Sequence, residues 1–496
     1  MPLGDRGLEQ VLGSILVSYN VCYATYVMKS KVHFVGIGGI GVSALARYFL
    51  AQNWAVSGSD LQDSSITQEL RREGIKTLIG HDKAHLGPEV GLVIHSQAIP
   101  LQNPELVEAR HLNIPIATYP EALGALTAEH KTIAVAGSHG KSTTTALIAK
   151  ILIEAGFDPT VIVGTKLRDF GNKNFRLGGS NWLVIEADEY REAFRHYEPD
   201  TLIITNVDRE HLDYYRNLQS VQKAFLNFAG NLKDGGIMVA NNDDPGLRAI
   251  KSEFPADTIW YSLQSRVHLK LIARLEKALK ILGGFNLSNS LAAALAARSL
   301  GIDDNDILSA VSGYRGAWRR MEYKGAMRIA RHKVKVFDDY AHHPTEIKAT
   351  LSALREHSPK AQLICVFQPH QLHRLKVLFN DFRESFDKVD ALILLDAYKV
   401  TGRDAPALSR AEVSHNVSAA KLARAIAKNK KHPEVVYLPH REDLKGILKS
   451  IIKSSKTKSS IVVMMGAGDI ADITPRLLEH RGARYSSLGS LAAKRK

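Results

Sequence analysis

Apolar runs alternate with helical patterns along the first part of the chain. "KVHFVG" (31–36) is a short apolar run that ends in glycine, and "GVSALARYFLAQN" (41–53) after it has the spacing of a helix. The same order returns at "AVSGSD" (55–60) with "SSITQELRREG" (64–74), and again at "GLVIHSQAIP" (91–100). Buried parallel strands read as apolar runs joined by helices, so this pattern predicts a parallel sheet covered on both faces.

Two further series of the same kind follow a predicted boundary helix at 121–131. The second series has strands in "TIAVAG", "NWLVIEAD", "TLIITNVD" and "GGIMVANND", and an alanine-rich helix at 289–302. The third has strands in "VKVFDDYAHHP", "QLICVFQPH", "ALILLDAY", "EVVYLP" and "SSIVVMMGAGD". The pattern predicts an α/β chain of three domains. The expected boundaries are 28–125, 126–317 and 318–481, followed by a basic tail at 482–496.

Composition agrees with an ordinary globular protein of several domains. The chain has 496 residues, 45% of them apolar and 23% charged. Its two cysteines, Cys22 and Cys365, form no disulfide framework and fit a reducing compartment. The net charge of +14 comes largely from runs near the end, such as "KSIIKSSKTK" (449–458). Such runs are typical of solvated surface, and without a nucleic-acid-binding signature we expect no nucleic-acid partner.

The first 28 residues have a separate interpretation. Residues 11–28 are fairly apolar but follow no basic region and precede no small-residue cleavage site, so they predict neither a signal peptide nor a membrane span. We therefore expect no membrane insertion and a cytoplasmic location. Met28 directly precedes the first predicted strand and is the expected natural start. Deleting residues 1–27 should then leave folding and activity intact.

The first glycine-rich loop follows the first predicted strand. Gly36, Gly38 and Gly41 fit the spacing G-x-G-x-x-G, in which the glycines let backbone and a helix N-terminus approach a diphosphate. Asp60 ends the second strand, 24 residues after Gly36, where a ribose-binding acid is expected. By itself this motif suggests NAD, or a tight strand–helix turn without a ligand.

The second loop, "GSHGKSTTT" (137–145), is more specific. It differs from the standard P-loop, whose first glycine would fall at Val135. Its backbone N–H groups and Lys141 can nevertheless hold phosphates, and the Ser142 hydroxyl can bind Mg²⁺. Two loops predict two nucleotides in one enzyme, one as a substrate handle and one as a phosphoryl donor.

Acidic residues follow two strands of the second series. "VIEADEY" places Glu186, Asp188 and Glu189 after one strand, and "TNVDREHLDYY" places His211 after the next. The carboxyl ends of parallel strands share one edge, so we expect Glu186 and His211 to meet the cation held by Ser142. Solvent exposure or helix capping is the plainer interpretation of Glu189 and Asp213, and we prefer it for Asp213.

From residue 31 to about 480 the chain resembles the Mur ligase family. The resemblance rests on "GIGGIG", "GSD", "AIPLQNPE", "GSHGKSTTT", "EADEY", "TNVDREH", "FNLSNSLAA", "WRRMEYKG", "DDYAHHPTE" and "FQPHQLHR". It implies a Rossmann-like N-terminal domain that binds a UDP-sugar, a central P-loop-type ATPase domain and a Rossmann-like C-terminal domain. The last two motifs point to the branch that adds L-alanine to UDP-N-acetylmuramate in peptidoglycan precursor synthesis. The alternative is a recycling branch that adds a whole peptide.

The resemblance also implies a reaction and a set of residues. A carboxylate of the UDP-sugar takes the γ-phosphate of ATP to form an acyl phosphate, which the amine of alanine then attacks, with Mg²⁺ as cofactor. The implied UDP-sugar site is Gly36, Ile37, Gly38, Gly39, Ile40, Gly41, Asp60 and Ser96. The implied ATP site is Gly137, Ser138, His139, Gly140, Lys141, Ser142, Thr143, Asn286, Asn289, Arg320 and Asp339. The implied metal ligands are Ser142 and Glu186 for one Mg²⁺ and His211 for a second. The implied acceptor site is His342, His370 and Arg374, and the catalytic residues are Lys141, Glu186, His211 and Arg374.

The chain departs from the family pattern at four places. It has Glu210-His211 for the usual Asp-His, Phe285-Asn286 for His-Asn and His370-Gln371 for His-Arg, and the stretch 268–284 is shortened. Two other classes of function remain as alternatives. An NAD-dependent oxidoreductase would leave Lys141 and Glu186 without a role, and a catalytically inactive scaffold would not need them intact. The sequence does not determine the amino-acid preference, the oligomeric state or regulation.

Overall fold

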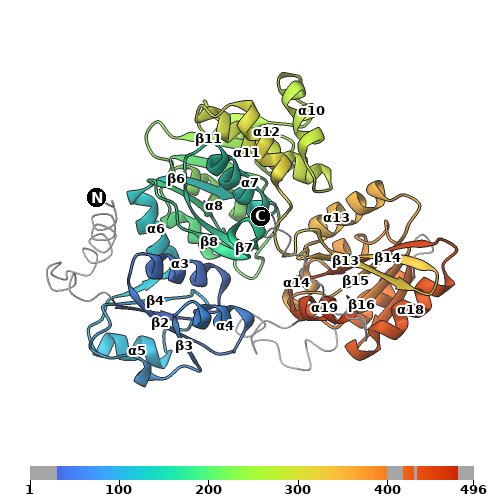
Figure 1. Ribbon diagram of the computed structural model, residues 1–496, viewed down its shortest axis with the longest axis horizontal. Coiled ribbons are helices and arrows are strands. Elements are labelled where there is room, and N and C mark those ends of the chain that lie inside the picture. Colours follow the sequence, from blue (N-terminus) through green and yellow to red (C-terminus); the bar gives the residue numbers. More distant parts are fainter. Residues whose placement is uncertain (1–30, 399–416, 429–432, 479–496) are drawn as a thin grey trace, which may run out of the picture. The chain divides into compact units, whose positions relative to one another are not determined.

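The computed structural model describes residues 31–398, 417–428 and 433–478 (Figure 1). These residues form two compact units, the first ending at Trp318 and the second beginning at Arg319. The predictions for residues 1–27 and for the tail at 482–496 lie outside the described residues, as do Cys22 and most of the basic run 428–432.

The first sheet has five parallel strands in the order β3-β2-β1-β4-β5. Its strands are β1 (Lys31–Val35), β2 (Ala55–Asp60), β3 (Lys76–Ile79), β4 (Leu92–His95) and β5 (Ile116–Thr118). The helices are α3 (Ile40–Ala51), α4 (Ser65–Arg72), α5 (Pro104–His111) and α6 (Tyr119–Glu129). Thr118 and Glu121 start α6 with a capping box, so the expected boundary helix begins at a specific local signal.

The second sheet has seven strands in the order β12-β11-β10-β6-β9-β7-β8. Its strands are β6 (Lys131–Ala136), β7 (Thr160–Leu167), β8 (Lys173–Arg176), β9 (Trp182–Glu186), β10 (Thr201–Ile204), β11 (Ile237–Asn241) and β12 (Ile259–Tyr261). Only β8 runs antiparallel among its described strands. The helices are α7 (Lys141–Glu154), α8 (Leu218–Ala229), α9 (Pro245–Arg248), α10 (Leu269–Ala278), α11 (Gly284–Ser299) and α12 (Asp304–Gly313).

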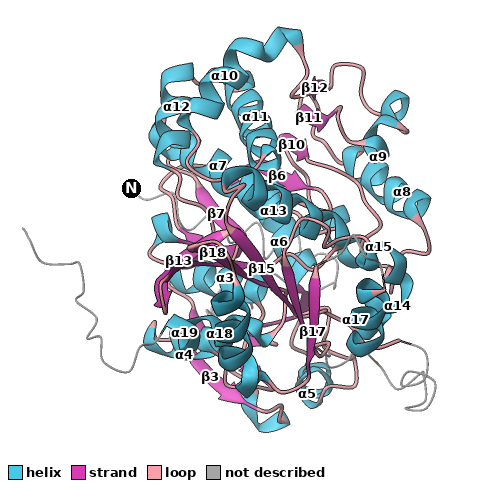
Figure 2. Cartoon of the chain, turned by 90° about the vertical axis from the view of Figure 1, so that its right-hand side faces the viewer, coloured by secondary structure: helices cyan, strands magenta, loops and turns pink. Residues whose placement is uncertain are grey.

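Successive residues of these strands point to opposite faces of the second sheet, which creates two cores. Ile133 and Val135 of β6 pack on the face with α7, α11 and α12, where the alanine-rich stretch of α11 allows close helix packing. Ala134 and Ala136 belong to the other core, which includes α8 and extends into the first sheet's core. Figure 2 shows α10, α11 and α12 gathered beside the strands β10 and β11.

The first two sheets are tied together by polar contacts as well as by this shared core. Arg47 of α3 donates to the Asn174 side chain of β8, and Asn174 in turn donates to the carbonyl of Ile40 at the start of α3. Lys166 of β7 lies 2.6 Å from a carboxylate oxygen of Glu69 on α4. The hairpin β7–β8 therefore fastens the first domain to the second within one compact unit.

The third sheet belongs to the second unit and has the order β13-β14-β18-β15-β16-β17. Its strands are β13 (Glu322–Ile329), β14 (His332–Asp339), β15 (Gln362–Phe367), β16 (Ala391–Leu395), β17 (Glu434–Leu438) and β18 (Ser459–Met465). Only β13 is antiparallel among the described strands. The helices are α13 (Pro344–His357), α14 (Leu372–Val377), α15 (Phe379–Arg383), α17 (Ala419–Ala427), α18 (Leu444–Ser454) and α19 (Ile473–Leu478).

The three predicted α/β series are therefore confirmed, and the structure adds elements that the pattern did not indicate. These are the hairpin β7–β8, the edge strand β13 and the helix α10, which occupies most of the shortened stretch 268–284. Within the described ranges, no helix combines the length and the apolar character needed to cross a membrane.

Candidate active site

The second glycine loop joins β6 to α7 in a conformation that needs its glycines. Gly137 and Gly140 have φ of 138° and 84°, in the left-handed region that disfavours other residues. A Cβ on Gly137 would lie 2.0 Å from the Thr205 hydroxyl oxygen, and one on Gly140 would lie 2.6 Å from the Asn289 amide oxygen. The loop is thus shaped by both backbone strain and close neighbours.

Residues at the end of β10 hold this loop in place. The Asn206 side chain accepts a hydrogen bond from the His139 N–H and donates one to the His139 carbonyl, both at 2.8 Å. The Ser138 hydroxyl accepts from the Asp208 N–H at 2.8 Å. Among the described residues no side chain caps the N-terminus of α7, which follows this loop directly, and such a helix N-terminus can receive an anion.

Lys141 folds back over the loop that precedes it. Its ammonium donates to the Gly137 carbonyl at 2.7 Å and to a carboxylate oxygen of Glu189 at 2.8 Å. Burial opposes the charged form, but the carboxylates of Glu189, Asp188 and Glu186 outweigh it and raise the pKa of Lys141. Lys141 is therefore a fixed positive charge at the helix N-terminus.

Glu189 is part of this site, a role that the sequence pattern does not indicate. Its side chain is fully buried rather than exposed or capping a helix. The chain after β9 turns through Arg191 and Glu192, whose φ values of 51° and 54° are left-handed. No pattern in the local sequence predicts that turn. Asp213, in contrast, is exposed as expected and accepts a hydrogen bond from Tyr190.

Ser142 and Glu186 meet as predicted. The Ser142 hydroxyl donates to one carboxylate oxygen of Glu186 at 3.0 Å, and the other oxygen accepts from the Gly164 N–H at 2.8 Å. Val135 of β6 pairs with Glu186 of β9, so neighbouring parallel strands deliver both side chains to one edge. A hydroxyl and a carboxylate are the hard oxygen donors that Mg²⁺ prefers.

His211 lies near two carboxylates other than that of Glu186. Its Nε2 is 3.6 Å from a Glu189 oxygen and 3.9 Å from an Asp188 oxygen, and these three residues could together hold a metal ion. The structure thus offers two donor groups, Ser142 with Glu186 and His211 with Asp188 and Glu189, and the binding of Mg²⁺ by any of these residues stays a prediction. His211 has a φ of 53°, which marks a constrained backbone.

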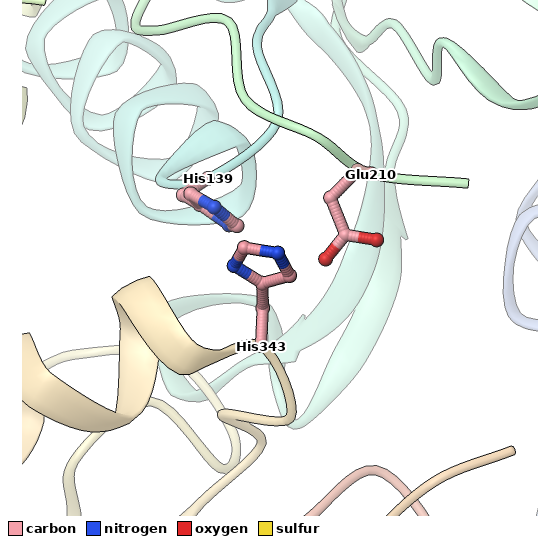
Figure 3. A group of neighbouring side chains, drawn as sticks. All are labelled: His139, Glu210 and His343. Atoms are coloured by element: carbon pink, nitrogen blue, oxygen red, sulfur yellow. The ribbon is translucent and has the colours of Figure 1, made fainter. Parts of the chain in front are cut away.

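Figure 3 shows His139 on the loop before α7 and Glu210 on the loop after β10. His139 Nε2 is 3.1 Å from an Asp208 oxygen, and a Glu210 oxygen accepts from the His211 N–H at 3.2 Å. The third side chain in Figure 3, His343, belongs to the second unit and caps α13 by accepting from the Thr345 N–H.

The asparagines of α11 also approach the second loop. Asn289 lies against Gly140, whereas the Asn286 amide donates to the Leu282 carbonyl at 2.6 Å. Thr143 is buried in the first turn of α7. The position of Asn289 fits the predicted nucleotide loop, and the contact of either asparagine with adenine stays a prediction.

The first glycine loop joins β1 to α3 and is held by the end of β2. The N–H groups of Gly36 and Ile37 donate to the Ser59 carbonyl at 2.8 and 3.0 Å. Asp60 accepts from the Gly38 N–H at 2.9 Å, so it orders the loop as well as lying where a ribose acid was expected. Ser96, predicted to belong to this site, packs against Gly36.

The same loop ends at a helix without a side-chain cap. Gly39 precedes Ile40 and Gly41, and among the described residues no side chain caps the first turn of α3. A Cβ on Gly41 would lie 2.9 Å from the Tyr119 ring, so close packing requires this third glycine. The loop therefore leads to a helix N-terminus that can receive an anion.

In the second unit, the structure brings together the three residues predicted for the acceptor site. The rings of His342 and His370 lie 5.7 Å apart, and an Arg374 Nη1 is 3.3 Å from His370 Nδ1. His370 also stacks on Tyr398. Glu384, an acid close to Arg374 in the sequence, lies 3.1 Å from Arg383.

Arg320 and Asp339 are engaged inside the second unit. Asp339 accepts from the Met321 and Ala341 N–H groups at 2.9 and 2.7 Å, and burial raises its pKa to about 6 against the effect of those donors. Arg320 lies over the Tyr340 ring and 3.6 Å from Glu346. Both residues order the start of the third sheet, and their contact with ATP stays a prediction.

The fold and these two loops define a class of protein: a multidomain α/β nucleotide-binding enzyme with a lysine-bearing phosphate loop and oxygen ligands for a cation. More narrowly, the chain belongs to the Mur ligase family, whose members are ATP-dependent amide ligases. Three family models match, described as "Mur ligase family, catalytic domain" (31–131), "Mur ligase middle domain" (135–297) and "Mur ligase, glutamate ligase domain" (319–468).

Individual relatives agree with this assignment. The chain is 37% identical over 487 residues to the UDP-N-acetylmuramate–L-alanine ligase of Syntrophus aciditrophicus, covering 94% of this chain and 97% of that protein. It is 34% identical over 465 residues to the enzyme of the same name from Clostridium perfringens, covering 90% and 97%. A crystal structure of UDP-N-acetylmuramate–alanine ligase from Thermotoga maritima superposes with a TM-score of 0.71 at 25% identity, covering 90% and 98%.

Proposed function

We propose that the chain joins L-alanine to the carboxylate of UDP-N-acetylmuramate, with conversion of ATP to ADP and phosphate, in peptidoglycan precursor synthesis. The hydrogen-bonded group of Lys141, Ser142 and their two carboxylates Glu186 and Glu189 carries this proposal. Relatives that bear the name of this activity align over nine-tenths or more of the chain, which supports the same assignment.

The domains take separate tasks in this proposal. Residues 28–125 bind the UDP-sugar, 126–317 bind ATP, and 318–481 supply the acceptor site. ATP and nucleotide sugars are cytoplasmic substrates, so we place the enzyme in the cytoplasm.

The first loop holds the diphosphate of the UDP-sugar through its backbone. The N-terminus of α3 supplies the donors, the glycines from Gly36 to Gly41 let the diphosphate approach it, and Asp60 orders the loop and faces the ribose. This task is binding alone, since the loop carries no lysine and no metal-binding side chain.

The second loop holds the β- and γ-phosphates of ATP. Lys141 is placed over the loop by Glu189 and meets the phosphate oxygens with a full positive charge. Gly137, Ser138, His139, Gly140 and Thr143 shape or line the loop, and the asparagines 286 and 289 of α11 lie behind it.

The donor groups also fit Mg²⁺. Ser142 and Glu186 present a hydroxyl and a carboxylate 3.0 Å apart, and Asp188, Glu189 and His211 form a second set of possible ligands. Bound Mg²⁺ would neutralise charge on the phosphate oxygens.

The reaction has two balanced steps. A carboxylate oxygen of the UDP-sugar attacks the γ-phosphorus of ATP, the bond to ADP breaks, and an acyl phosphate forms. The amine of alanine then attacks the acyl carbon, loses a proton and expels phosphate, which retains the original carboxylate oxygen. Catalysis here is chiefly positioning and charge stabilisation.

Arg374 provides the fork for the alanine carboxylate, since a guanidinium donates two parallel hydrogen bonds to such a group. His342 and His370 complete the acceptor site beside it. Arg320 and Asp339 contribute to ATP binding from the third domain.

The test is phosphate release from UDP-N-acetylmuramate, ATP and Mg²⁺ with L-alanine, L-serine, glycine or a murein peptide as acceptor. We expect ADP and the strongest activity with L-alanine, and no activity after chelation of the metal. Preference for the peptide would assign the chain to recycling. Release of AMP, or turnover with NAD in place of ATP, would refute the proposal.

A further inference from the structure

A cavity in the second unit is lined by none of the candidate active-site residues described above. It has a volume of about 540 Å³ and is lined by residues of β13, α18 and α19, together with Ala330 in the turn after β13 (Figure 1). Cavities of this size commonly hold small ligands. Its lining contains apolar residues and basic residues, and these two kinds together indicate the chemistry of a fitting ligand.

The floor of the cavity is apolar. Met327 and Ile329 project from β13, Leu448 from α18 and Leu477 from α19, and all four side chains are largely buried in the third sheet's core. Such a floor gives no hydrogen bonds and favours contact with hydrocarbon.

The rim of the cavity is basic. Lys445, Lys449 and Lys453 recur every fourth residue, which places them along one face of α18 at roughly 6 Å intervals. Arg328 of β13 adds a fourth positive charge, and all four residues are exposed. Within the described ranges, none of these four side chains forms an ion pair or hydrogen bond.

Four unpaired cations around one cavity repel each other, and an anionic partner would relieve that repulsion. The described lining contains no aromatic side chain on which a nucleobase could stack, so it lacks the platform typical of single-stranded nucleic-acid sites. A straight row of lysines above an apolar floor instead matches a plane of anionic headgroups with hydrocarbon beneath it.

We propose that this cavity receives an anionic phospholipid, so that the face formed by α18, α19 and β13 docks reversibly on an anionic bilayer surface. The apolar side of α18 is packed in the protein core, so the helix remains at the surface and does not insert. Each basic residue near an anionic surface contributes roughly fivefold to partitioning, and the effect weakens with salt. The inference is independent of the ligase chemistry.

The experiment is co-sedimentation of the full chain with two kinds of vesicle: phosphatidylcholine alone, and equal parts phosphatidylcholine and phosphatidylglycerol. We expect binding only to the second kind, with loss at high salt. The triple variant Lys445→Glu/Lys449→Glu/Lys453→Glu should lower partitioning by about a hundredfold or more. Unchanged ligase turnover without vesicles verifies that it is folded.

The matched control is Lys270→Glu/Lys277→Glu/Lys280→Glu, which changes the net charge equally at exposed lysines on and just after α10. We expect this control to sediment like the unmodified chain. Equal loss in both triple variants, or no loss in the α18 variant, would overturn the proposal. The proposal would also be overturned if the unmodified chain bound a mixed-sequence RNA but no anionic vesicles, and if the α18 variant lost the RNA binding.

Discussion

The two glycine loops share one layout and differ in the side chains that they bring to the helix N-terminus. The first loop, between β1 and α3, is ordered by Asp60 and leads to the N-terminus of α3 without a charged side chain of its own. The second, between β6 and α7, adds Lys141 and Ser142, each hydrogen-bonded to a carboxylate. Under the proposed function, glycines and a helix N-terminus serve to bind the UDP-sugar, whereas phosphoryl transfer also uses a fixed charge and metal-binding oxygens.

Removing Lys141 should separate the two loops most clearly. We expect Lys141→Met to lower kcat by about 10²–10³ or more while UDP-sugar affinity stays unchanged, because only the second loop loses its charge. Calorimetry with the UDP-sugar and rapid-quench measurement of ADP formation give the two readouts.

A control is needed because Lys141→Met leaves Glu189 buried without its partner, which costs about 3–5 kcal/mol of stability. The double variant Lys141→Met/Glu189→Gln removes that charge and should fold normally while remaining inactive. If the folded double variant also lost the UDP-sugar, the division between the loops would be wrong.

Arg374→Ala should affect neither loop and raise the KM for alanine. Loss of a charge-assisted hydrogen-bond partner costs roughly 1.5–3 kcal/mol, about ten- to a hundredfold in affinity. Arg374→Lys should rescue only part of this, since lysine lacks the fork, and Gln371 offers no second cation where the family usually has arginine. Steady-state kinetics with each substrate varied provide the test, with the exposed Arg383→Ala as control. An unaltered alanine KM in folded Arg374→Ala would leave His370 as the better candidate.

Gly38→Ala should damage the first loop alone. The new Cβ would lie 2.8 Å from the Asp60 carboxylate that orders the loop, and such overpacking costs roughly 1–3 kcal/mol. We expect the KM for the UDP-sugar to rise about five- to a hundredfold with the KM for ATP unchanged. Gly39→Ala is the matched control, because its Cβ meets nothing closer than 3.4 Å. Equal effects of the two variants would show that the Asp60 contact does not matter.

The smallest expected effect concerns Glu105, a carboxylate that is buried in the first domain as Glu189 is in the second. Burial opposes ionisation of Glu105, but the side chains of His33, Ser59 and His85 outweigh it and lower its pKa to about 2. A depressed folded-state pKa stabilises the domain above the ordinary pKa of 4.5, and this contribution is lost as pH falls towards 2.

We therefore expect the backbone amide hydrogens of β1 to exchange with solvent faster as pH falls from 4.5 towards 2, after correction for the pH dependence of intrinsic exchange. Glu105→Gln should already show faster exchange at neutral pH and little further change of this kind on acidification. Glu108→Gln, on the same helix but partly exposed, should behave like the unmodified chain. Identical pH profiles for Glu105→Gln and the unmodified chain would contradict the assignment.

Much of the fold and of both loops could be predicted because the signals are local. An apolar run followed by glycines and a helical period specifies a strand, a loop and a helix, and this holds for Gly36 and Gly140 alike. The meeting of Ser142 and Glu186 was predictable as well, since neighbouring parallel strands end at one edge.

The remaining features depend on conformation that no local pattern encodes. The chain after β9 passes through the left-handed residues Arg191 and Glu192, and the Glu189 carboxylate just before them lies within ion-pair distance of both Lys141 and His211. The hairpin β7–β8 is interrupted by a register shift and so lacks a clean alternating pattern. In the third sheet, β18 is inserted between β14 and β15 although it comes last in the chain, an order that periodicity does not reveal.

The central claim is that the UDP-sugar's carboxylate attacks the phosphate held by the second loop. UDP-N-acetylmuramate labelled with oxygen-18 in both carboxylate oxygens tests it directly by mass spectrometry of the released phosphate. The account predicts that each phosphate carries a single labelled oxygen and that the peptide product retains the other. Unlabelled phosphate, with both labelled oxygens lost or kept elsewhere, would contradict the acyl-phosphate route and the role assigned to Lys141.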